Sequence, residues 1–205
     1  MPVTETIARP AKCQRCDRTL RVPILCDGCH TLYPAAQAVD HFSLLGLPRR
    51  FDLDPQQLHQ AYIAISRNIH PDYFGGQPPE MQRLALRLSA AVNEARAVLS
   101  DPLLRAEYLL ETAGGKSAAE DKRVPPELLG EVMMLREELE ETRRCGDAGA
   151  VETIRAQVRR RAEATMSRVA GLARGVTEDP GEGLLDELRL ELNAMKYLNN
   201  LLSEL

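Results

Sequence analysis

Two groups of residues in this 205-residue chain have types and spacings that could do chemistry. The first is a pair of C-x-x-C motifs, nine residues apart, that supplies Cys13, Cys16, Cys26 and Cys29. Each motif presents two thiolates from one tight turn, and two such turns complete a tetrahedral metal site. A module of this size buries too little apolar surface to fold unaided, so we expect a bound metal to hold it together.

Zinc is the metal that this ligand set predicts, and iron in a rubredoxin-like site is the chemical alternative. Two redox-active C-x-x-C pairs are another alternative, but neither pair follows a strand in a βαβ context. His30 could replace one cysteine as a ligand, although four cysteines already complete the shell. Cys145 lies far from this group in the sequence, and we expect no role for it.

The second group is the tripeptide His70-Pro71-Asp72, in a loop that ends in Gly75-Gly76. Pro71 fixes one backbone dihedral and would hold the flanking side chains outward in a stiff turn. Asp72 offers a carboxylate suited to a bidentate arginine on a partner, and His70 can donate a hydrogen bond. An acid–base pair is an alternative, but no nucleophile, phosphate loop or second polar cluster lies nearby. An ordinary Pro-Asp turn is the simplest alternative.

Composition limits the class of protein. The chain is 44% hydrophobic and 27% charged, with a net charge of −4, so we expect globular domains without unspecific nucleic-acid binding. No apolar run approaches the roughly 20 residues of a membrane span, and the N-terminus lacks an apolar run of signal-peptide length. We therefore expect a cytoplasmic protein without membrane contacts, or a mitochondrial matrix protein if the source is eukaryotic.

From His41 onward, apolar residues recur at spacings of three and four, which predicts an all-α fold. Asp54 and Pro55 mark a helix start, and Pro71 marks a helix end. Two helices therefore flank the His-Pro-Asp loop as a hairpin, and the last three helices form an antiparallel bundle. The predicted helices occupy about residues 41–47, 54–69, 79–100, 103–110, 126–144, 148–174 and 182–205.

These patterns predict four segments. A small zinc-ribbon or knuckle-like metal-binding module comes first, the hairpin domain follows, and a linker marked by Gly114-Gly115 leads to the three-helix bundle. The predicted boundaries are residues 1–37, 38–114, 115–124 and 125–205.

From about Asp40 to Leu205, the sequence resembles the HscB family, the J-domain co-chaperones of iron–sulfur cluster assembly. Five segments carry the resemblance: HFSLLGLPRRFDLD (41–54), IHPDYFGG (69–76), DPLLRAEYLL (101–110), LREELEE (135–141) and MKYLNNLL (195–202). The resemblance implies that residues 38–114 are a J domain and that the protein is not itself an enzyme. Members from some lineages also carry an N-terminal paired C-x-x-C extension.

The resemblance also implies two protein partners. The J domain would stimulate the ATPase of a seventy-kilodalton heat-shock chaperone of HscA or DnaK type, through His70, Pro71, Asp72, Arg67 and Tyr73. The bundle would deliver an iron–sulfur scaffold protein of IscU type, bound through Leu129, Met133, Glu137 and Tyr197, and so promote cluster maturation and transfer. Gly130 and Met134 depart from the family's pattern, which has a larger apolar residue and an acid there.

The chain also departs from typical J domains in its charge. Those domains carry several basic residues on the helix before the loop and a lysine after it. Here that helix carries Arg67 alone, and Tyr73 takes the lysine position. Fewer positive charges slow steering toward an acidic chaperone surface, which favours a dedicated chaperone partner.

Two other functions stay open at this point. A zinc-ribbon nucleic-acid or transcription adaptor with a helical dimerisation domain would use the basic residues beside the cysteines, which are Lys12, Arg15, Arg18 and Arg21. A metal-transfer or redox protein would use the four thiolates directly. A homodimer through the metal module is also open.

Overall fold

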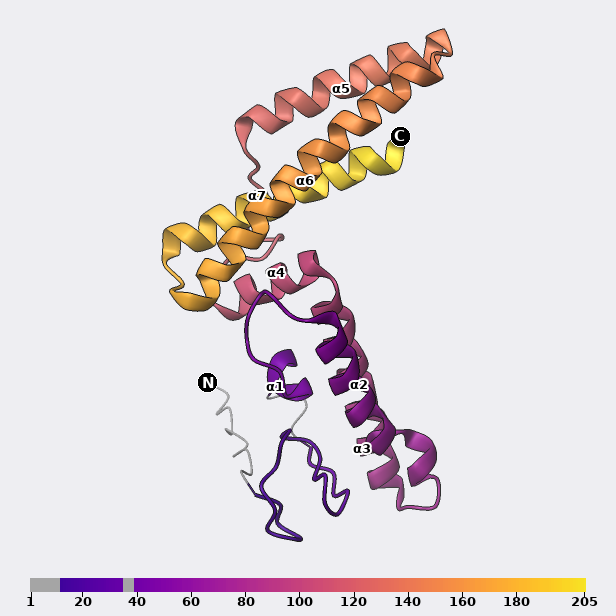
Figure 1. Cartoon of the computed structure of the whole chain (residues 1–205), viewed down its shortest axis with the longest axis vertical. Helices are drawn as coiled ribbons and strands as arrows, with labels where there is room; N and C mark the ends of the chain where they lie inside the picture. The colour runs from indigo at the N-terminus through magenta and orange to yellow at the C-terminus, as the bar shows by residue number, and fades with distance from the viewer. Residues whose placement is uncertain (1–11, 35–38) are drawn as a thin grey trace. The chain divides into compact units, whose positions relative to one another are not determined.

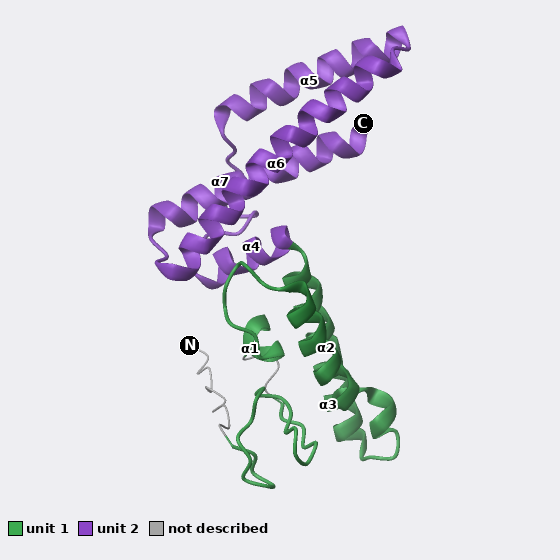
Figure 2. Cartoon of the chain, in the orientation of Figure 1, with its two compact units in different colours: residues 1–101 green, residues 102–205 purple. Residues whose placement is uncertain are grey.

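The computed structural model describes residues 12–34 and 39–205. The chain divides into two compact units, residues 1–101 and residues 102–205 (Figure 2). Within the described ranges the regular structure is helical, apart from isolated β-bridges around the cysteines. The predicted all-α fold is therefore confirmed. Over the same ranges, no helix combines the length and the apolar character needed to cross a bilayer.

The first unit contains a helical hairpin (Figure 1). Its elements are α1 (His41–Leu45), α2 (Pro55–Ile69), the 3-10 helix η2 (Pro71–Phe74) and α3 (Pro79–Ser100). The carboxylate of Asp54 accepts a hydrogen bond of 2.9 Å from the Gln56 amide, and Pro55 takes the first helical position of α2. The helices α2 and α3 pack along each other, and α1 packs against both. The predicted hairpin with the tripeptide at its tip is therefore present.

The second unit is built around the longest helix of the chain. Its elements are α4 (Pro102–Thr112), α5 (Pro126–Cys145), α6 (Ala148–Glu178) and α7 (Glu182–Glu204). The helices α6 and α7 pack together, and α5 packs against both of them. On α5, the apolar residues that recur at spacings of three and four are buried throughout: Leu128, Val132, Leu135 and Leu139. These three helices form the bundle that the spacing predicts.

Helix α4 also belongs to this unit. The sequence prediction places it in the domain at 38–114, whereas in the structure it packs against α6 and α7, and the units divide after Asp101. Ala106, Leu109 and Leu110 are fully buried on α4. The apolar spacing of a short helix identifies its buried face but not the partner that covers it, which explains the difference.

Gly114 and Gly115 stop helix α4. Gly114 adopts a left-handed conformation with φ of 88°, which a glycine reaches without strain. The Gly115 amide then donates a hydrogen bond of 3.0 Å to the carbonyl oxygen of Leu110. A Cβ atom on Gly115 would lie 2.7 Å from Leu110 Cγ, so no larger residue fits here without a shift. The Gly114 amide also donates to the carbonyl oxygen of Glu111 at 3.0 Å, so the glycine pair ends the helix in a Schellman motif.

The segment after this cap, residues 116–123, is fastened to α7, and we call it the strap. The side-chain amide of Asn193 donates hydrogen bonds to the carbonyl oxygens of Asp121 (2.9 Å) and Arg123 (2.7 Å). Lys116 adds an ion pair of 3.2 Å with Asp186 of α7. The segment predicted as a linker, 115–124, is therefore attached to α7, because Asn193 donates hydrogen bonds to two of its backbone carbonyl oxygens.

Candidate functional site

The four clustered cysteines form a ligand set for a metal ion. Their sulfur atoms lie within 4.8 Å of one another. Cys13 Sγ is 3.4 Å from Cys29 Sγ, and Cys16 Sγ is 3.6 Å from Cys26 Sγ. Zn–S bonds of about 2.3 Å in a tetrahedron place the sulfurs about 3.8 Å apart. The donor type and the spacing therefore fit a tetrahedral thiolate site, as predicted.

The two C-x-x-C turns repeat one backbone geometry. The residue after each motif is left-handed, with φ of 57° at Asp17 and 54° at His30. Their amides donate to the carbonyl oxygens of Cys13 (2.8 Å) and Cys26 (2.9 Å). Aspartate and histidine tolerate this conformation better than most residues. His30 therefore closes a turn, and the clustered ligand set consists of the four cysteines.

Hydroxyl groups support two of the four sulfurs. The Tyr33 hydroxyl donates to Cys13 Sγ at 3.2 Å and accepts from the Gln14 amide at 3.0 Å. The Thr31 hydroxyl lies 3.1 Å from Cys29 Sγ. Such second-layer donors stabilise thiolates and orient metal ligands. Sequence reasoning missed both residues, because a tyrosine and a threonine near a cysteine pair are common without this role.

Without the metal, Cys13 and Cys16 hold their protons unequally. The hydrogen bond from Tyr33 lowers the pKa of Cys13 to about 5. At Cys16 the Arg18 amide lowers the pKa, but the neighbouring sulfurs, first that of Cys26, and burial outweigh it and raise the pKa to about 12. Metal ions bind thiolates, so binding must displace the proton that Cys16 retains, and affinity rises with pH.

The basic residues beside the cysteines are partly neutralised. Lys12 pairs with Asp17 at 3.7 Å, and Arg21 pairs with Asp27 at 3.3 Å. Arg15 and Arg18 have no such partner within the described residues. Two of the four basic residues are thus paired with carboxylates, so this segment has less free positive charge to attract a nucleic acid.

The His-Pro-Asp loop is exposed at the tip of the hairpin. The side chains of His70 and Asp72 are 54% and 86% exposed. The Asp72 amide donates to His70 Nδ1 at 3.3 Å, and the same nitrogen lies 3.4 Å from Asp72 Oδ2. In the neutral imidazole whose Nδ1 accepts this bond, Nε2 carries the proton and can donate. Tyr73 is also exposed, and its ring meets the His70 ring edge-on, with centroids 6.3 Å apart. The loop therefore presents a carboxylate, an imidazole and a phenol together.

A glutamine of α3 restrains this loop through two hydrogen bonds. Gln82 Nε2 donates to the carbonyl oxygens of Gly75 (3.1 Å) and Gln77 (2.8 Å). These two carbonyls follow η2 and would otherwise face water. Gln82 is a site residue that the sequence did not reveal, since nothing in its spacing distinguishes it from other exposed residues of α3.

The predicted scaffold-binding residues of α5 are exposed. Leu129 is 43% exposed, Met133 is 65% exposed, and Glu137 lies four residues further along. Their spacing of four places all three on one helix face. Met134, the position that departs from the family's pattern, is also exposed. We call Leu129, Met133, Glu137 and Tyr197 the bundle patch.

The apolar residues of α7 differ in their exposure. Ala194 and Leu201 are covered, whereas Tyr197 is 38% exposed. Tyr197 lines a cavity of about 360 Å³ together with Arg136 of α5 and Lys122 of the strap. Arg136 lies one turn after Met133, so Tyr197 and the exposed face of α5 belong to one continuous surface.

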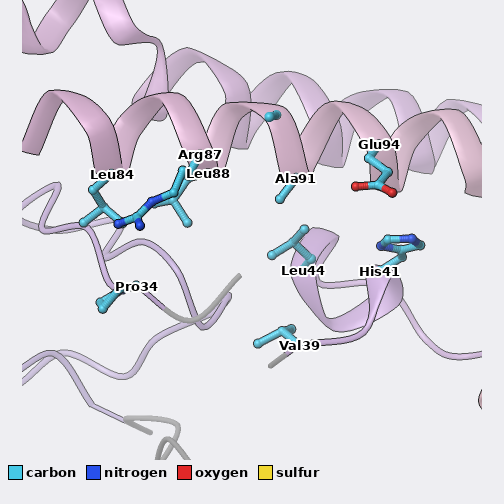
Figure 3. A pocket seen from close by; sticks show the side chains of 10 residues that line it. Pro34, Val39, His41, Leu44, Leu84, Arg87, Leu88, Ala91 and Glu94 are labelled. Carbon is cyan, nitrogen blue, oxygen red and sulfur yellow. The ribbon is translucent and has the colours of Figure 1, made fainter. Parts of the chain in front are cut away.

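A cavity of about 480 Å³ lies within the first unit, between α1 and α3 (Figure 3). Its lining is mainly apolar, and its charged side chains are Arg87, Glu94 and His41. Burial lowers the pKa of His41, while the carboxylate of Glu94 opposes that shift. The described residues that line the cavity include no serine, threonine or cysteine.

Known proteins resemble both units. Residues 124–205 match the family model described as the HSCB C-terminal oligomerisation domain. A co-chaperone protein HscB homolog of Bordetella pertussis is 42% identical over 136 residues, which cover 64% of this chain and 79% of that protein. The chain belongs to the HscB family of co-chaperones. This confirms the resemblance that the five sequence segments carry.

Two further HscB proteins place the family match in context. The HscB homolog of Bordetella petrii is 46% identical over 107 residues, and the match spans 63% of that protein's length and 52% of this chain. The crystal structure of the human co-chaperone protein HscB has a TM-score of 0.75 and 24% identity, and the match covers 94% of this chain and 95% of that one. The human structure supports the HscB fold.

Proposed function

We propose that this HscB-family chain stimulates the ATPase of a seventy-kilodalton heat-shock chaperone and delivers an iron–sulfur scaffold protein to it. Cluster maturation and transfer would follow from that delivery. The observation that carries the proposal is the exposed His-Pro-Asp loop on a braced hairpin in one unit, combined with an exposed apolar patch on the other unit. The chain's own role is binding, without covalent chemistry.

The loop is suited to chaperone binding because it is already ordered. Pro71 and the hydrogen bonds of Gln82 restrict the loop, so little entropy is lost when a partner docks. The Asp72 carboxylate can receive an arginine in two hydrogen bonds, and His70 can donate through Nε2. Arg67, in the last turn of α2, and the exposed Tyr73 extend this surface.

The bundle patch is suited to an apolar surface on the scaffold. Leu129 and Met133 expose apolar side chains to water, and covering them with an apolar surface of a partner is favourable. Methionine also adapts its shape to irregular surfaces. Glu137 would add a charge at the edge of the contact. Two binding surfaces in one chain raise the effective concentration of scaffold at the chaperone.

We propose zinc as the metal of the cysteine module, with iron as the alternative. The four cysteines would hold the ion, which supplies a structural crosslink between the two C-x-x-C turns. A homodimer through this module is a further prediction, which mass measurement by light scattering with and without chelator would test. The bacterial cytoplasm is the compartment we propose, or the mitochondrial matrix if the source is eukaryotic.

A steady-state ATPase assay tests the chaperone function. Purified chaperone is combined with the full chain, with and without scaffold protein, and wild type is compared with Asp72→Asn. We expect the variant to lose the stimulation, because the amide cannot form the charge-assisted pair. Asp179→Asn, which changes an exposed aspartate of the other unit, is the matched control. Full stimulation by Asp72→Asn would refute the proposed loop contact.

The same assay tests the choice of chaperone. The low positive charge around the loop predicts stronger stimulation of a dedicated chaperone than of a general one. Equal and strong stimulation of both would contradict this part of the proposal.

Calorimetry tests the scaffold function. The triple variant Leu129→Ala, Met133→Ala and Tyr197→Ala should lose most of its affinity for the scaffold while its helical circular dichroism is retained. Leu86→Ala removes a similarly exposed leucine from the first unit and should bind normally. Unchanged affinity of a folded triple variant would reject the bundle patch.

A further inference from the structure

The four cysteines of the module differ in their access to solvent. Cys13 and Cys26 are buried, Cys29 is partly buried, and Cys16 is exposed. A reagent in solution therefore reaches the sulfur of Cys16 more readily than the other three. Access alone separates Cys16 from Cys13 and Cys26.

The four sulfurs also differ in the hydrogen bonds that quench their reactivity. Cys13 receives the Tyr33 hydroxyl and the Arg15 amide, and Cys29 receives the Thr31 hydroxyl. Cys26 receives the Gly28 amide, while Cys16 receives the Arg18 amide and no hydroxyl. Hydrogen bonds to a thiolate stabilise its charge and lower its nucleophilicity. Cys16 therefore combines exposure, which Cys26 lacks, with a weaker set of donors than Cys13 and Cys29 have.

Two arginines lie close to Cys16 in the sequence. Arg15 and Arg18 flank Cys16 in the chain, both are exposed, and neither forms an ion pair within the part of the chain that the structure describes. Reactive cysteines typically lie in such electropositive and accessible surroundings. Two unpaired arginines this close in sequence would favour the approach of anionic electrophiles.

We propose that Cys16 is a modification site, through which electrophiles and peroxides open the metal centre. The inference rests on the proposed tetrathiolate metal site. When the metal is bound, all four sulfurs are thiolates, so access and hydrogen bonding distinguish them. Modification of Cys16 removes one ligand charge, and the ion then leaves a site of three thiolates.

For hydrogen peroxide the step balances in two parts. The Cys16 sulfur attacks one peroxide oxygen, the O–O bond breaks, and the departing hydroxide takes a proton from solvent to form water. This leaves a sulfenic acid on Cys16. The Cys26 thiolate, 3.6 Å away, then attacks that sulfur and displaces hydroxide, which is protonated to a second water. One peroxide thus converts two thiolates into a disulfide between Cys16 and Cys26.

Alkylation of the full chain tests the order of reactivity. The protein carries Cys145→Ala, which removes the exposed cysteine outside the module, and its metal content is measured first. After reaction with less than one equivalent of iodoacetamide, peptide mass spectrometry locates the label and a chromophoric chelator measures released zinc. We expect the labelled fraction of Cys16 to be about tenfold higher than that of each other cysteine. One zinc ion should be released for each label attached. Label spread evenly, or found first on Cys13, Cys26 or Cys29, would overturn the proposal.

Two variants separate the causes. Thr31→Val removes the hydroxyl at Cys29 and should raise labelling of Cys29 while labelling of Cys16 stays the same. Arg15→Gln with Arg18→Gln should slow the reaction of Cys16 with anionic iodoacetate more than its reaction with neutral iodoacetamide. Identical rates for the two reagents in this variant and in the parent would refute the electrostatic part.

Treatment with hydrogen peroxide tests the disulfide. We expect zinc release together with a Cys16–Cys26 disulfide, both reversed by a thiol reductant and added zinc. Zinc release with another cysteine pair joined would contradict the proposed route. A protein that binds no metal even after reconstitution would instead refute the metal centre itself, whereas a metal-loaded protein with even labelling would refute this inference alone.

Discussion

The guanidinium of Arg189 on α7 is fully buried and forms a bidentate pair with the carboxylate of Glu107 on α4. Arg189 Nη1 donates to Glu107 Oε1 at 2.6 Å, and Arg189 Nη2 donates to Oε2. Arg189 Nε has no partner among the described atoms. Burial raises the pKa of Glu107, and the neighbouring guanidinium opposes that rise. This pair fixes α4 to the second unit.

Removing the carboxylate should therefore destabilise the second unit. In Glu107→Ala the arginine charge stays buried without its partner, and we expect a loss of about 3 kcal/mol in the free energy of unfolding. Urea denaturation followed by circular dichroism measures it. Glu111→Ala, on the same helix and exposed, should cost much less. Equal losses in the two variants would show that the pair does not stabilise the unit.

Gln82 should matter for chaperone stimulation although it does not belong to the tripeptide. Gln82→Ala frees the carbonyl oxygens of Gly75 and Gln77, so the loop samples more conformations and binding costs more entropy. We expect a several-fold higher concentration of the variant for half-maximal ATPase stimulation, with maximal stimulation retained. Gln60→Ala, on the exposed face of α2, is the matched control. If both variants behave like wild type, the loop does not need this support.

The strap should lose stability in acid. Hydrogen bonds from the Arg123 side chain and amide hold the pKa of the Asp121 carboxyl well below its usual range. A group with a lowered folded pKa stabilises the fold above its unfolded pKa, and this contribution is lost as pH falls through the folded pKa. Asp121→Asn should therefore melt below wild type at neutral pH, and the difference should shrink below about pH 4.

Thermal melting across this pH range measures the effect. Asp179→Asn, at an exposed position, controls for the loss of an aspartate. A difference between wild type and Asp121→Asn that is the same at neutral pH and in strong acid would contradict the assignment.

Metal removal should affect the cysteine module and spare the helices. Residues 12–34 contain isolated bridges, and their buried side chains include the ligands Cys13 and Cys26, so the module depends on the metal, whereas α1 to α7 have their own cores. After chelation we expect trypsin to cut after Arg15, Arg18 and Arg21 at least tenfold faster, with the helical circular dichroism unchanged. Loss of helical signal in parallel with loss of metal would contradict this independence.

Sequence reasoning succeeded where one short segment determines the outcome. The α5 stripe is set by spacing within one helix, and the metal ligands are set by two C-x-x-C turns. The same holds for Asp54, whose side chain caps its own helix. Local pattern suffices in these cases because the partners of each residue lie within a few positions.

Sequence reasoning failed where a polar residue meets a distant partner. Arg189 and Glu107 are separated by 82 positions, and Asn193 is 72 and 70 positions from its two partners in the strap. In the sequence, both look like exposed polar residues of a helix. The assignment of α4 failed for the same reason, because its neighbours are chosen by tertiary packing and not by its own spacing.

Asn193 limits where the chain can be truncated to make a stable fragment of the second unit. The side-chain amide of Asn193 is buried and is satisfied by two carbonyl oxygens of the strap. A recombinant fragment that begins at residue 124, where the family match starts, would carry the bundle but lack both acceptors. A fragment that begins at Pro102 retains the strap and α4, so it keeps both acceptors of the Asn193 amide and the carboxylate that pairs with Arg189.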